Sequence, residues 1–297
     1  MPALDRIESS PSQSSPSLAS PQVYWNAAAE TYERDFTGTV IGQMWRESVW
    51  REMDAAFHAG SHILELNCGT GIDAIHLAGR GVSVLGCDIS SRMIELAQQN
   101  ACKAGFEPLL DFRVLPTEDL ALLRADVLPG ATFDGAFSNF SGLNCVDDLA
   151  AVRRNLAQRI RPGSPLFLCM LGRFNLWGRL KQLSRANFKE AFRVVRAGRG
   201  IPVNGSVTVR YPSSREIEVL FSPDFKLRAW KGIGIVVPPA YMERWVIRVP
   251  GLARILNCIE QLVAGLPGIR SLGACILLEF ERTTAQEMSH AGPEAKP

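Results

Sequence analysis

Short apolar runs alternate with segments of helical periodicity along most of the chain, and glycine-rich or polar turns separate them. The apolar runs are at residues 63–66, 82–88, 112–115, 133–138 and 166–171, and the helical segments between them are at 72–78, 90–105 and 149–160. Continuous apolar runs are typical of parallel strands buried on both faces, and strands alternating with helices favour a sheet covered on both sides. We therefore predict an α/β fold with a doubly wound, mostly parallel sheet.

The other segments have different patterns, which suggest how the chain is divided. Residues 24–57 have helical periodicity, and residues 173–200 are amphipathic, with Arg and Lys on the polar face and Glu190 as the only acid. The C-terminal part is expected to contain strands at 207–211, 225–237 and 275–281, a short helix at 215–221, and helices at 241–266 broken at Pro250-Gly251. We predict a disordered tail (1–21), a helical cap (22–60), a ligand-binding core (61–172), an inserted lid or substrate segment (173–212), the C-terminal part of the core sheet (213–282) and a second disordered tail (283–297).

Composition bounds the class of protein. At 297 residues and 46% apolar composition, the chain can bury one large core. It has neither the run of 18 apolar residues that a transmembrane helix needs nor the apolar leader of a signal peptide, so we expect a soluble, cytoplasmic protein. Seven cysteines without a C-x-x-C pair favour reduced thiols over a disulfide framework or a metal site. The net charge of +2 indicates no particular partner.

A glycine turn follows the first apolar run and is the most informative part of the sequence. Gly69 and Gly71 allow positive φ and leave no Cβ between the main chain and a ligand, while the amides that open the next helix face that ligand. Asp88 ends the second strand, where a carboxylate can accept both hydroxyls of an adenosine ribose. With Ala74, this spacing also satisfies the dinucleotide fingerprint G-x-G-x-x-G/A.

Glu65 favours one of these two ligands. It stands four positions before Gly69, so its carboxylate is expected near the mouth of the turn, where it would repel a pyrophosphate and attract an ammonium or a sulfonium. The residues ELNCGTG at 65–71, followed by GCDIS at 86–90 and by Met93, resemble motifs I and II of the class I S-adenosylmethionine-dependent methyltransferases. The resemblance implies a Rossmann-like, seven-stranded sheet with an antiparallel last strand, and S-adenosylmethionine as cofactor.

The resemblance also implies a set of cofactor-binding residues on the loops of the core. They are Glu65, Asn67, Gly69, Thr70, Gly71, Asp88, Ile89, Met93, Thr117, Glu118, Ser138 and Asn139. One position departs from the family, because Pro116 stands where many relatives carry an acid that binds the adenine amino group. Thr117 or Glu118 is expected to replace that contact, and the alternative for Glu118 is a charge at a helix N-terminus without a ligand.

The methyl acceptor is expected beside the fourth strand and under the cap. The candidate substrate-binding residues are Tyr24, Tyr32, Phe140, Asn144 and Trp177, and the weak candidates for a general base are Tyr211, Tyr241 and Glu243. A base is needed only where the acceptor must lose a proton. Aromatic residues at helical spacing can equally be ordinary core. SNFS at 138–141 stands where amino-methylating nucleic-acid and protein enzymes carry an N-P-P-Y type motif, which favours a small-molecule acceptor and no nucleic acid.

Two alternatives remain open from the sequence. One is a non-catalytic S-adenosylmethionine-binding or membrane-surface protein, in which the basic amphipathic segment 173–200 contacts anionic lipid instead of serving as a lid. The other is an NAD(P)-dependent oxidoreductase, which Glu65 argues against. The identity of the acceptor and the oligomeric state do not follow from the sequence.

Overall fold

The computed structural model describes residues 20–123, 132–188, 192, 200–203, 207–222 and 224–284. The two tails expected to be disordered, at 1–21 and 283–297, lie almost wholly outside these residues.

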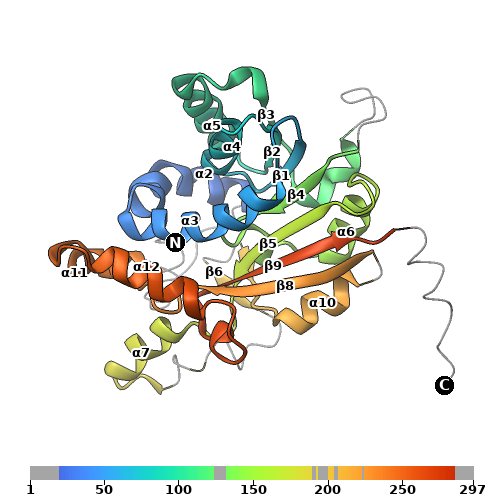
Figure 1. Ribbon diagram of the computed structural model, residues 1–297. Helices are drawn as coiled ribbons and strands as arrows, with labels where there is room; N and C mark the ends of the chain where they lie inside the picture. Colours follow the sequence, from blue (N-terminus) through green and yellow to red (C-terminus); the bar gives the residue numbers. More distant parts are fainter. Residues whose placement is uncertain are drawn as a thin grey trace, which may run out of the picture.

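A seven-stranded sheet runs through the molecule in the order β3-β2-β1-β4-β5-β9-β8 (Figure 1). Its strands are β1 His62–Leu66, β2 Ser83–Asp88, β3 Leu110–Val114, β4 Gly135–Ser138, β5 Pro165–Leu171, β8 Phe225–Ile233 and β9 Cys275–Arg282. Strands β1 to β5 are parallel to one another, and β9 is antiparallel to both β5 and β8. The predicted doubly wound sheet with an antiparallel last strand is therefore confirmed.

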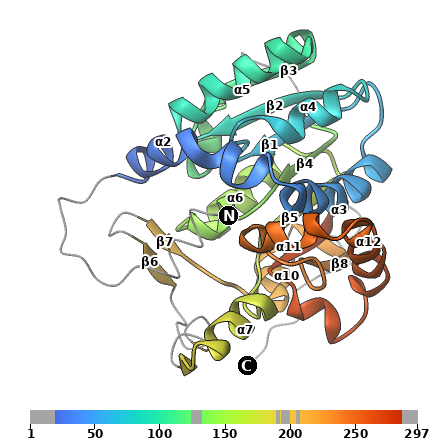
Figure 2. The same ribbon diagram turned by 90° about the vertical axis from the view of Figure 1, so that its left-hand side faces the viewer.

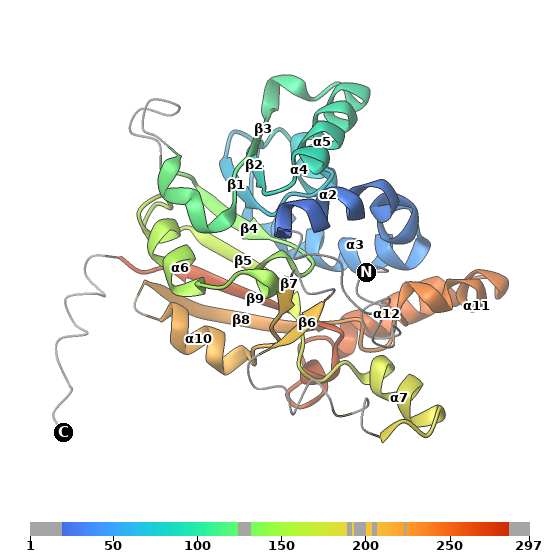
Figure 3. The same ribbon diagram turned by 180° about the vertical axis from the view of Figure 1, so that it is seen from behind.

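Helices cover both faces of the sheet, which Figures 1 and 3 show from opposite sides. They are α3 Val40–Ala56, α4 Ile72–Ala78 and α5 Ser91–Ala104 on one face, and α6 Leu149–Ala157 and α10 Ser214–Phe221 on the other. Local signals set their ends: Ser90 caps α5 by accepting from the Met93 amide, and Ser213 opens α10 with a capping box. Helix α4 buries Asp73 with Ala74, Leu77 and Ala78, whereas Ile72, Ile75 and His76 are half-buried.

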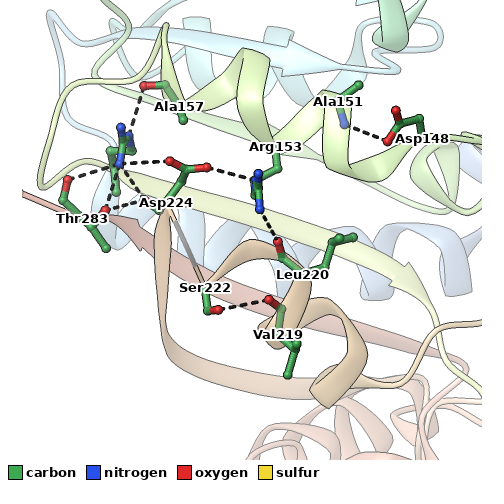
Figure 4. A network of polar contacts seen from close by, with 10 residues as sticks. Asp148, Ala151, Arg153, Ala157, Val219, Leu220, Ser222, Asp224 and Thr283 are labelled. Atoms are coloured by element: carbon green, nitrogen blue, oxygen red, sulfur yellow. Dashed lines mark hydrogen bonds and ion pairs between the residues drawn. The ribbon is translucent and has the colours of Figure 1, made fainter. Parts of the chain in front are cut away.

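A polar network fastens the last strands to α6 (Figure 4). Asp224, in the turn before β8, pairs with Arg153 of α6 at 3.0 Å, and its carbonyl accepts from Arg282 at the end of β9 at 2.8 Å. The same two arginines donate to the carbonyls of Leu220 and Ala157. Three segments that are distant in the sequence, α6, the turn before β8 and the end of β9, are joined at this point.

The cap lies over the carboxyl edge of the sheet and consists of α2 Pro21–Tyr32, a single π turn η1 Glu33–Thr37, and α3. Figure 2 shows α2 and α3 beside β1 and β4. The 3-10 turns η2 Glu107–Leu109, η3 Thr117–Leu122 and η4 Gly142–Cys145 lie in the connections of the core.

The insertions after β5 and β8 also lie at the carboxyl edge, because β8 runs parallel to β1–β5. They contain α7 Leu176–Ser184, the hairpin β6 Ile201–Val203 and β7 Val207–Val209, η5 Ala240–Met242, α11 Glu243–Arg248, α12 Leu252–Val263 and η6 Ile269–Leu272. The amphipathic pattern at 173–200 corresponds to α7 at its start, and most of its second half lies outside the described residues. No helix in the described part of the chain has the length and hydropathy to cross a bilayer.

Candidate cofactor site

The carboxyl ends of β1, β2 and β4 bring three loops together at the middle of the sheet. These loops are 67–71, 88–90 and 139–144. Among the described residues, three of the four non-glycine positions with positive φ lie here: Asn67 (55°), Phe140 (47°) and Ser141 (78°). Backbone held in this region is strained for L-residues and concentrates at functional sites.

The glycine turn is shaped by both of its glycines. Gly69 and Gly71 have φ of 54° and 76°. A Cβ on Gly71 would lie 2.9 Å from both the Ala97 Cβ and the Phe112 ring, so packing excludes any side chain there. A Cβ on Gly69 would meet only the edge of the Tyr32 ring, at 4.0 Å. The absence of a side chain at Gly71 therefore lets the turn pack directly against α5 and β3. The absence of one at Gly69 leaves the backbone accessible on the side toward the cap.

Asp88 is held at the end of β2 by backbone amides. Its Oδ2 accepts from the Gly69 amide at 3.0 Å and its Oδ1 from the Ser90 amide at 2.9 Å. Burial raises the pKa of Asp88, and the hydrogen bonds from the amides of Ser90, Gly69 and Ile89 oppose that rise. The carboxylate is thus fixed in orientation, with lone pairs left for hydroxyl donors.

The cap is tied to this site by three polar contacts. Ser90 Oγ donates to Asn26 Oδ1 of α2 at 2.6 Å. Asn100 Nδ2 of α5 donates to Glu33 Oε1 of η1 at 2.7 Å and to the Thr70 carbonyl at 3.1 Å. Because these contacts join α2 to the loop after β2 and, through Asn100, η1 to the glycine turn, α2 and η1 form a roof that is anchored over the site.

A buried charged cluster lies below the roof. Arg46 of α3 pairs with Asp73 of α4 at 2.6 Å, and both side chains are 5% exposed. Trp50 Nε1 donates to the other Asp73 oxygen at 2.6 Å, and the Tyr32 hydroxyl lies against the Arg46 guanidinium. Glu65 lies close to this pair and is 1% exposed. Burial raises the pKa of Glu65 well above its usual value, Asp73 raises it further, and Arg46 opposes both.

Several buried polar atoms around the glycine turn have no hydrogen-bond partner among the residues that the structure describes. They are Glu65 Oε2, Thr70 Oγ1, Asn139 Oδ1 and Arg46 Nε. Buried polar atoms without a partner are rare in folded proteins because each costs about 1–3 kcal/mol. Four such atoms gather around this turn, and because both acceptors and donors are represented, the site can accept a ligand that offers both.

Comparison with known proteins identifies this core. Residues 63–163 match the family described as "Methyltransferase domain". A glycine N-methyltransferase of Mus musculus is 32% identical over 118 residues, which is 37% of this chain and 40% of that protein. A ubiquinone biosynthesis O-methyltransferase of Xanthomonas axonopodis pv. citri (strain 306) is 31% identical over 115 residues, 39% of this chain and 45% of that protein. Over this core the sequence is similar to S-adenosylmethionine-dependent methyltransferases, in agreement with the resemblance of the glycine turn and Asp88 to their motifs.

Solved methyltransferase structures share the fold of the chain. A magnesium protoporphyrin IX methyltransferase from Synechocystis PCC 6803 has a TM-score of 0.53 at 16% identity, over 88% of this chain and 97% of that one. A geranyl diphosphate C-methyltransferase from Streptomyces coelicolor A3(2) has a TM-score of 0.53 at 17% identity, over 90% and 100%. The chain spans less than half the length of the two curated relatives it matches, so the methyltransferase core is the shared part.

The loop after β4 closes the methyltransferase site on one side. Ser138 Oγ donates to Asn67 Oδ1 at 3.2 Å, and Gly142 passes so close to Asn67 that a Cβ there would overlap its side chain. Phe140 is buried edge-on against Phe36 at 5.2 Å. Asn67, which also donates to Thr117 Oγ1 at 2.9 Å, thus joins three loops of the site.

Some expected adenine and acceptor contacts are placed differently. Glu118 is exposed, and Thr117 is buried with its hydroxyl bonded to Asn67. Met93 is 3% exposed and Ile89 is half-buried beside Asp88. Asn144 is fully buried, and its amide binds the backbone of Leu171 and Arg210, so it tethers β5 to the inserted hairpin.

The aromatic candidates lie at the roof and in the insertions. Tyr24 and Tyr32 are half-buried against the core, and burial raises the pKa of both phenols. Trp177 of α7 donates from Nε1 to the Ile235 carbonyl at 3.0 Å. Tyr211 packs against the same core cluster.

The two other base candidates are engaged at the outer side of the cap. Tyr241 is 40% exposed with Lys181 Nζ 4.0 Å over its ring. The Glu243 carboxylate accepts from the Val40 amide at the start of α3. Arg34 of η1 has a side chain that is 70% exposed and pairs with Asp35.

The sequence reasoning missed Arg46, Asp73, Asn26 and Asn100. A signal was present for Arg46, because it stands three positions before Val49 and seven before Met53, on the apolar face of the cap helix. An arginine on such a face is buried only with a partner, and Asp73 lies 27 positions away.

Proposed function

We propose that the chain binds S-adenosylmethionine at this site and transfers its methyl group to the O, N or C atom of a small-molecule acceptor. The observation that carries the proposal is the set of unpartnered buried atoms around the glycine turn. The carboxylate of Glu65 and the amide oxygen of Asn139 fit the α-ammonium of the methionine moiety. Arg46 and the Thr70 hydroxyl fit its α-carboxylate.

The rest of the site fits an adenosine without phosphates. Asp88 offers lone pairs to the ribose hydroxyls, and Ile89 and Met93 offer apolar surface for the adenine ring. The buried carboxylate of Glu65, beside Asp73, would repel the pyrophosphate of a dinucleotide. The ionic character of the site thus favours the adenosyl cofactor over NAD(P).

The reaction is a displacement in which the acceptor atom forms a bond to the methyl carbon as the carbon–sulfur bond breaks and its electron pair stays on sulfur. The cofactor supplies an already activated methyl group. The chain therefore acts mainly by alignment and by exclusion of water. Phe140, Tyr24 and the roof helices are placed to do both, and Tyr211, Tyr241 and Glu243 remain the candidates for a base where the acceptor must lose a proton.

The acceptor is taken to be a small molecule handled in the cytoplasm, with no nucleic acid involved. The names of two relatives reported above refer to glycine and to ubiquinone biosynthesis, and glycine and ubiquinone are both small molecules. The bond from Trp177 to the Ile235 carbonyl holds α7 against the 233–240 segment, which supports the lid interpretation of residues 173–212. This boundary and the other domain boundaries are proposals of the same kind.

Titration of Asp88→Asn with S-adenosylhomocysteine tests the proposal. The amide keeps the size of the side chain and loses charge-assisted acceptance from two hydroxyls, so the affinity is expected to fall about 100-fold, since such hydrogen bonds contribute roughly 1.5–3 kcal/mol each. The matched control is Asp111→Asn on β3, a carboxylate that is 55% exposed and paired with Arg113.

Wild-type binding of NADH in place of the adenosyl ligand would overturn the assignment, and equal losses in the two variants would remove Asp88 from the site. Binding without methyl transfer to any acceptor would leave the non-catalytic alternative.

A further inference from the structure

Helix α12 has apolar residues on two sides: Ala253 and Leu256 pack against the core, and a second apolar stripe faces outward. Ile255, Ile259 and Leu262, at positions i, i+4 and i+7, are 57%, 41% and 76% exposed. The buried residue on the opposite side is a carboxylate, Glu260, which accepts from the amides of Ile235, Val236 and Val237 at 2.6–3.0 Å. Soluble helices normally turn their apolar stripe to the core. The outward stripe of α12 is therefore available to something outside the chain.

The preceding helix extends this surface. Trp245, Ile247 and Val249 are 67%, 58% and 53% exposed. We call the exposed apolar residues of α11 and α12, from Trp245 to Leu262, the α11–α12 face. The two helices are in contact, and exposed apolar side chains gathered on neighbouring helices mark interaction sites.

The charge on this face has one sign. Arg244, Arg248 and Arg254 are exposed, and Glu260, which is buried, is the only acid between residues 244 and 270. The whole chain has a net charge of only +2, so the positive charge is local. Large apolar side chains with tryptophan, bordered by arginines, are the composition of helices that lie in the surface of an anionic bilayer.

The face lies at the edge of the sheet where the cofactor site is. Figures 1 and 3 show α7 beside α11 and α12 at one side of the molecule, and Lys181 of α7 lies over the Tyr241 ring. Glu243 at the start of α11 binds the Val40 amide at the start of α3, the cap helix that carries Arg46. The surface is thus fixed to the elements that roof the site.

We propose that the α11–α12 face docks on the surface of an anionic lipid bilayer. The apolar stripe enters the region between headgroups and acyl chains, and the arginines meet the lipid phosphates. A second copy of the chain fits less well, because a two-fold interface would place the arginine-bordered patch against itself. Docking does not require methyl transfer, so a test of docking does not depend on the proposed function.

Sedimentation with vesicles of phosphatidylcholine containing 30% phosphatidylglycerol tests the docking. We expect the full chain to bind at low salt, and the double variant Ile255→Glu, Leu262→Glu to bind at least tenfold more weakly. The matched control is Val219→Glu on α10, a site that is 64% exposed outside the face and is expected to bind as the wild type does. Replacing Arg248 by Gln is expected to weaken binding about fivefold. Far-UV circular dichroism and cooperative urea unfolding show that each variant is folded.

Two exposed cysteines of the chain allow a second measurement, with fluorescent labels. Cys258 lies on the outer side of α12 next to Ile259, and Cys102 lies exposed on α5. A fluorophore on Cys258 in the Cys102→Ser variant is expected to be quenched by spin-labelled lipid, and one on Cys102 in the Cys258→Ser variant is not. The proposal is overturned if the chain does not bind vesicles, or if the Val219→Glu control loses as much binding as the double variant. It is also overturned if the chain forms a concentration-dependent dimer that the double variant abolishes and binds no vesicles.

Discussion

At the scale of single residues, Glu65 links the chemistry of the site to pH. Its carboxyl is buried beside Asp73, so in the free protein its pKa is raised and it holds a proton above the usual range for glutamic acid. The native state then binds more protons than the unfolded state, so the Glu65 contribution to stability is present at low pH and is lost as pH rises above the unfolded value toward the folded pKa.

Binding of the cofactor ammonium is expected to reverse this shift. The positive charge stabilises the ionised carboxylate, so binding releases a proton and the affinity for S-adenosylhomocysteine rises with pH by up to about tenfold per unit below the free-protein pKa. Calorimetry at one pH in buffers of different ionisation enthalpy measures the released proton. Glu65→Gln is the control and is expected to release less; an unchanged release in that variant would assign the proton to another group.

The residues that the sequence predicted and those that it missed differ in one respect. Gly69, Gly71 and Asp88 act through backbone geometry and through their place at the end of a strand, and both are visible in a local pattern. Arg46 and Asp73 act through each other, and a pair 27 positions apart on two helices leaves no local pattern. Asn144 illustrates the converse, since a polar residue in a loop of the site proved to be a buried tether.

At the scale of elements, the position of α12 depends on Glu260. Three amides of the 235–237 segment donate to its carboxylate, so Glu260→Ala would leave them buried without an acceptor. We expect this change to lower the free energy of unfolding by about 3 kcal/mol, measured by urea denaturation. The next residue, Gln261, is exposed, and Gln261→Ala is expected to stay within about 0.5 kcal/mol. Equal effects of the two changes would contradict this role.

The network around Asp224 offers a second test at this scale (Figure 4). The side chains of Arg153, Asp224 and Arg282 are only 16%, 21% and 11% exposed, so water screens their interactions weakly. Asp224→Ala is expected to destabilise the chain by about 2–3 kcal/mol in thermal or urea unfolding. A surface pair provides the comparison: Glu95→Ala removes the exposed Arg92–Glu95 pair and is expected to cost less than about 1 kcal/mol. A cost for Asp224→Ala as small as that would show the network to be dispensable.

Periodicity predicted the elements of the core well, because β1, β2, β4 and β5 are buried along nearly their whole length. The edge strand β3 buries only Phe112, and its predicted bounds of 112–115 were less accurate. Periodicity served less well in the insertions. The apolar pattern of α12 predicted a helix correctly, but a stripe turned toward solvent has the same sequence as a stripe turned toward a core. Only the three-dimensional position of Glu260 separates the two.

At the scale of the whole molecule, the cofactor is expected to stabilise the fold by mass action. S-adenosylhomocysteine at 100 times its dissociation constant should add about 2.7 kcal/mol and raise Tm by roughly 5–10 °C. A thermal-shift measurement checks this, with NADH at the same concentration as the control ligand. Asp88→Asn should lose most of the shift; a shift with NADH alone would contradict the cofactor assignment.

The outward stripe of α12 also has a consequence for how the sequence can change over time. Because hydrogen bonds to one carboxylate hold the helix in place, Ile255, Ile259 and Leu262 carry little of the folding free energy. Mutations at these three positions are therefore constrained by whatever the surface touches and hardly by the core. Homologues that work away from lipid are free to exchange them for polar residues, and an engineer seeking a more soluble enzyme can do the same without rebuilding the fold.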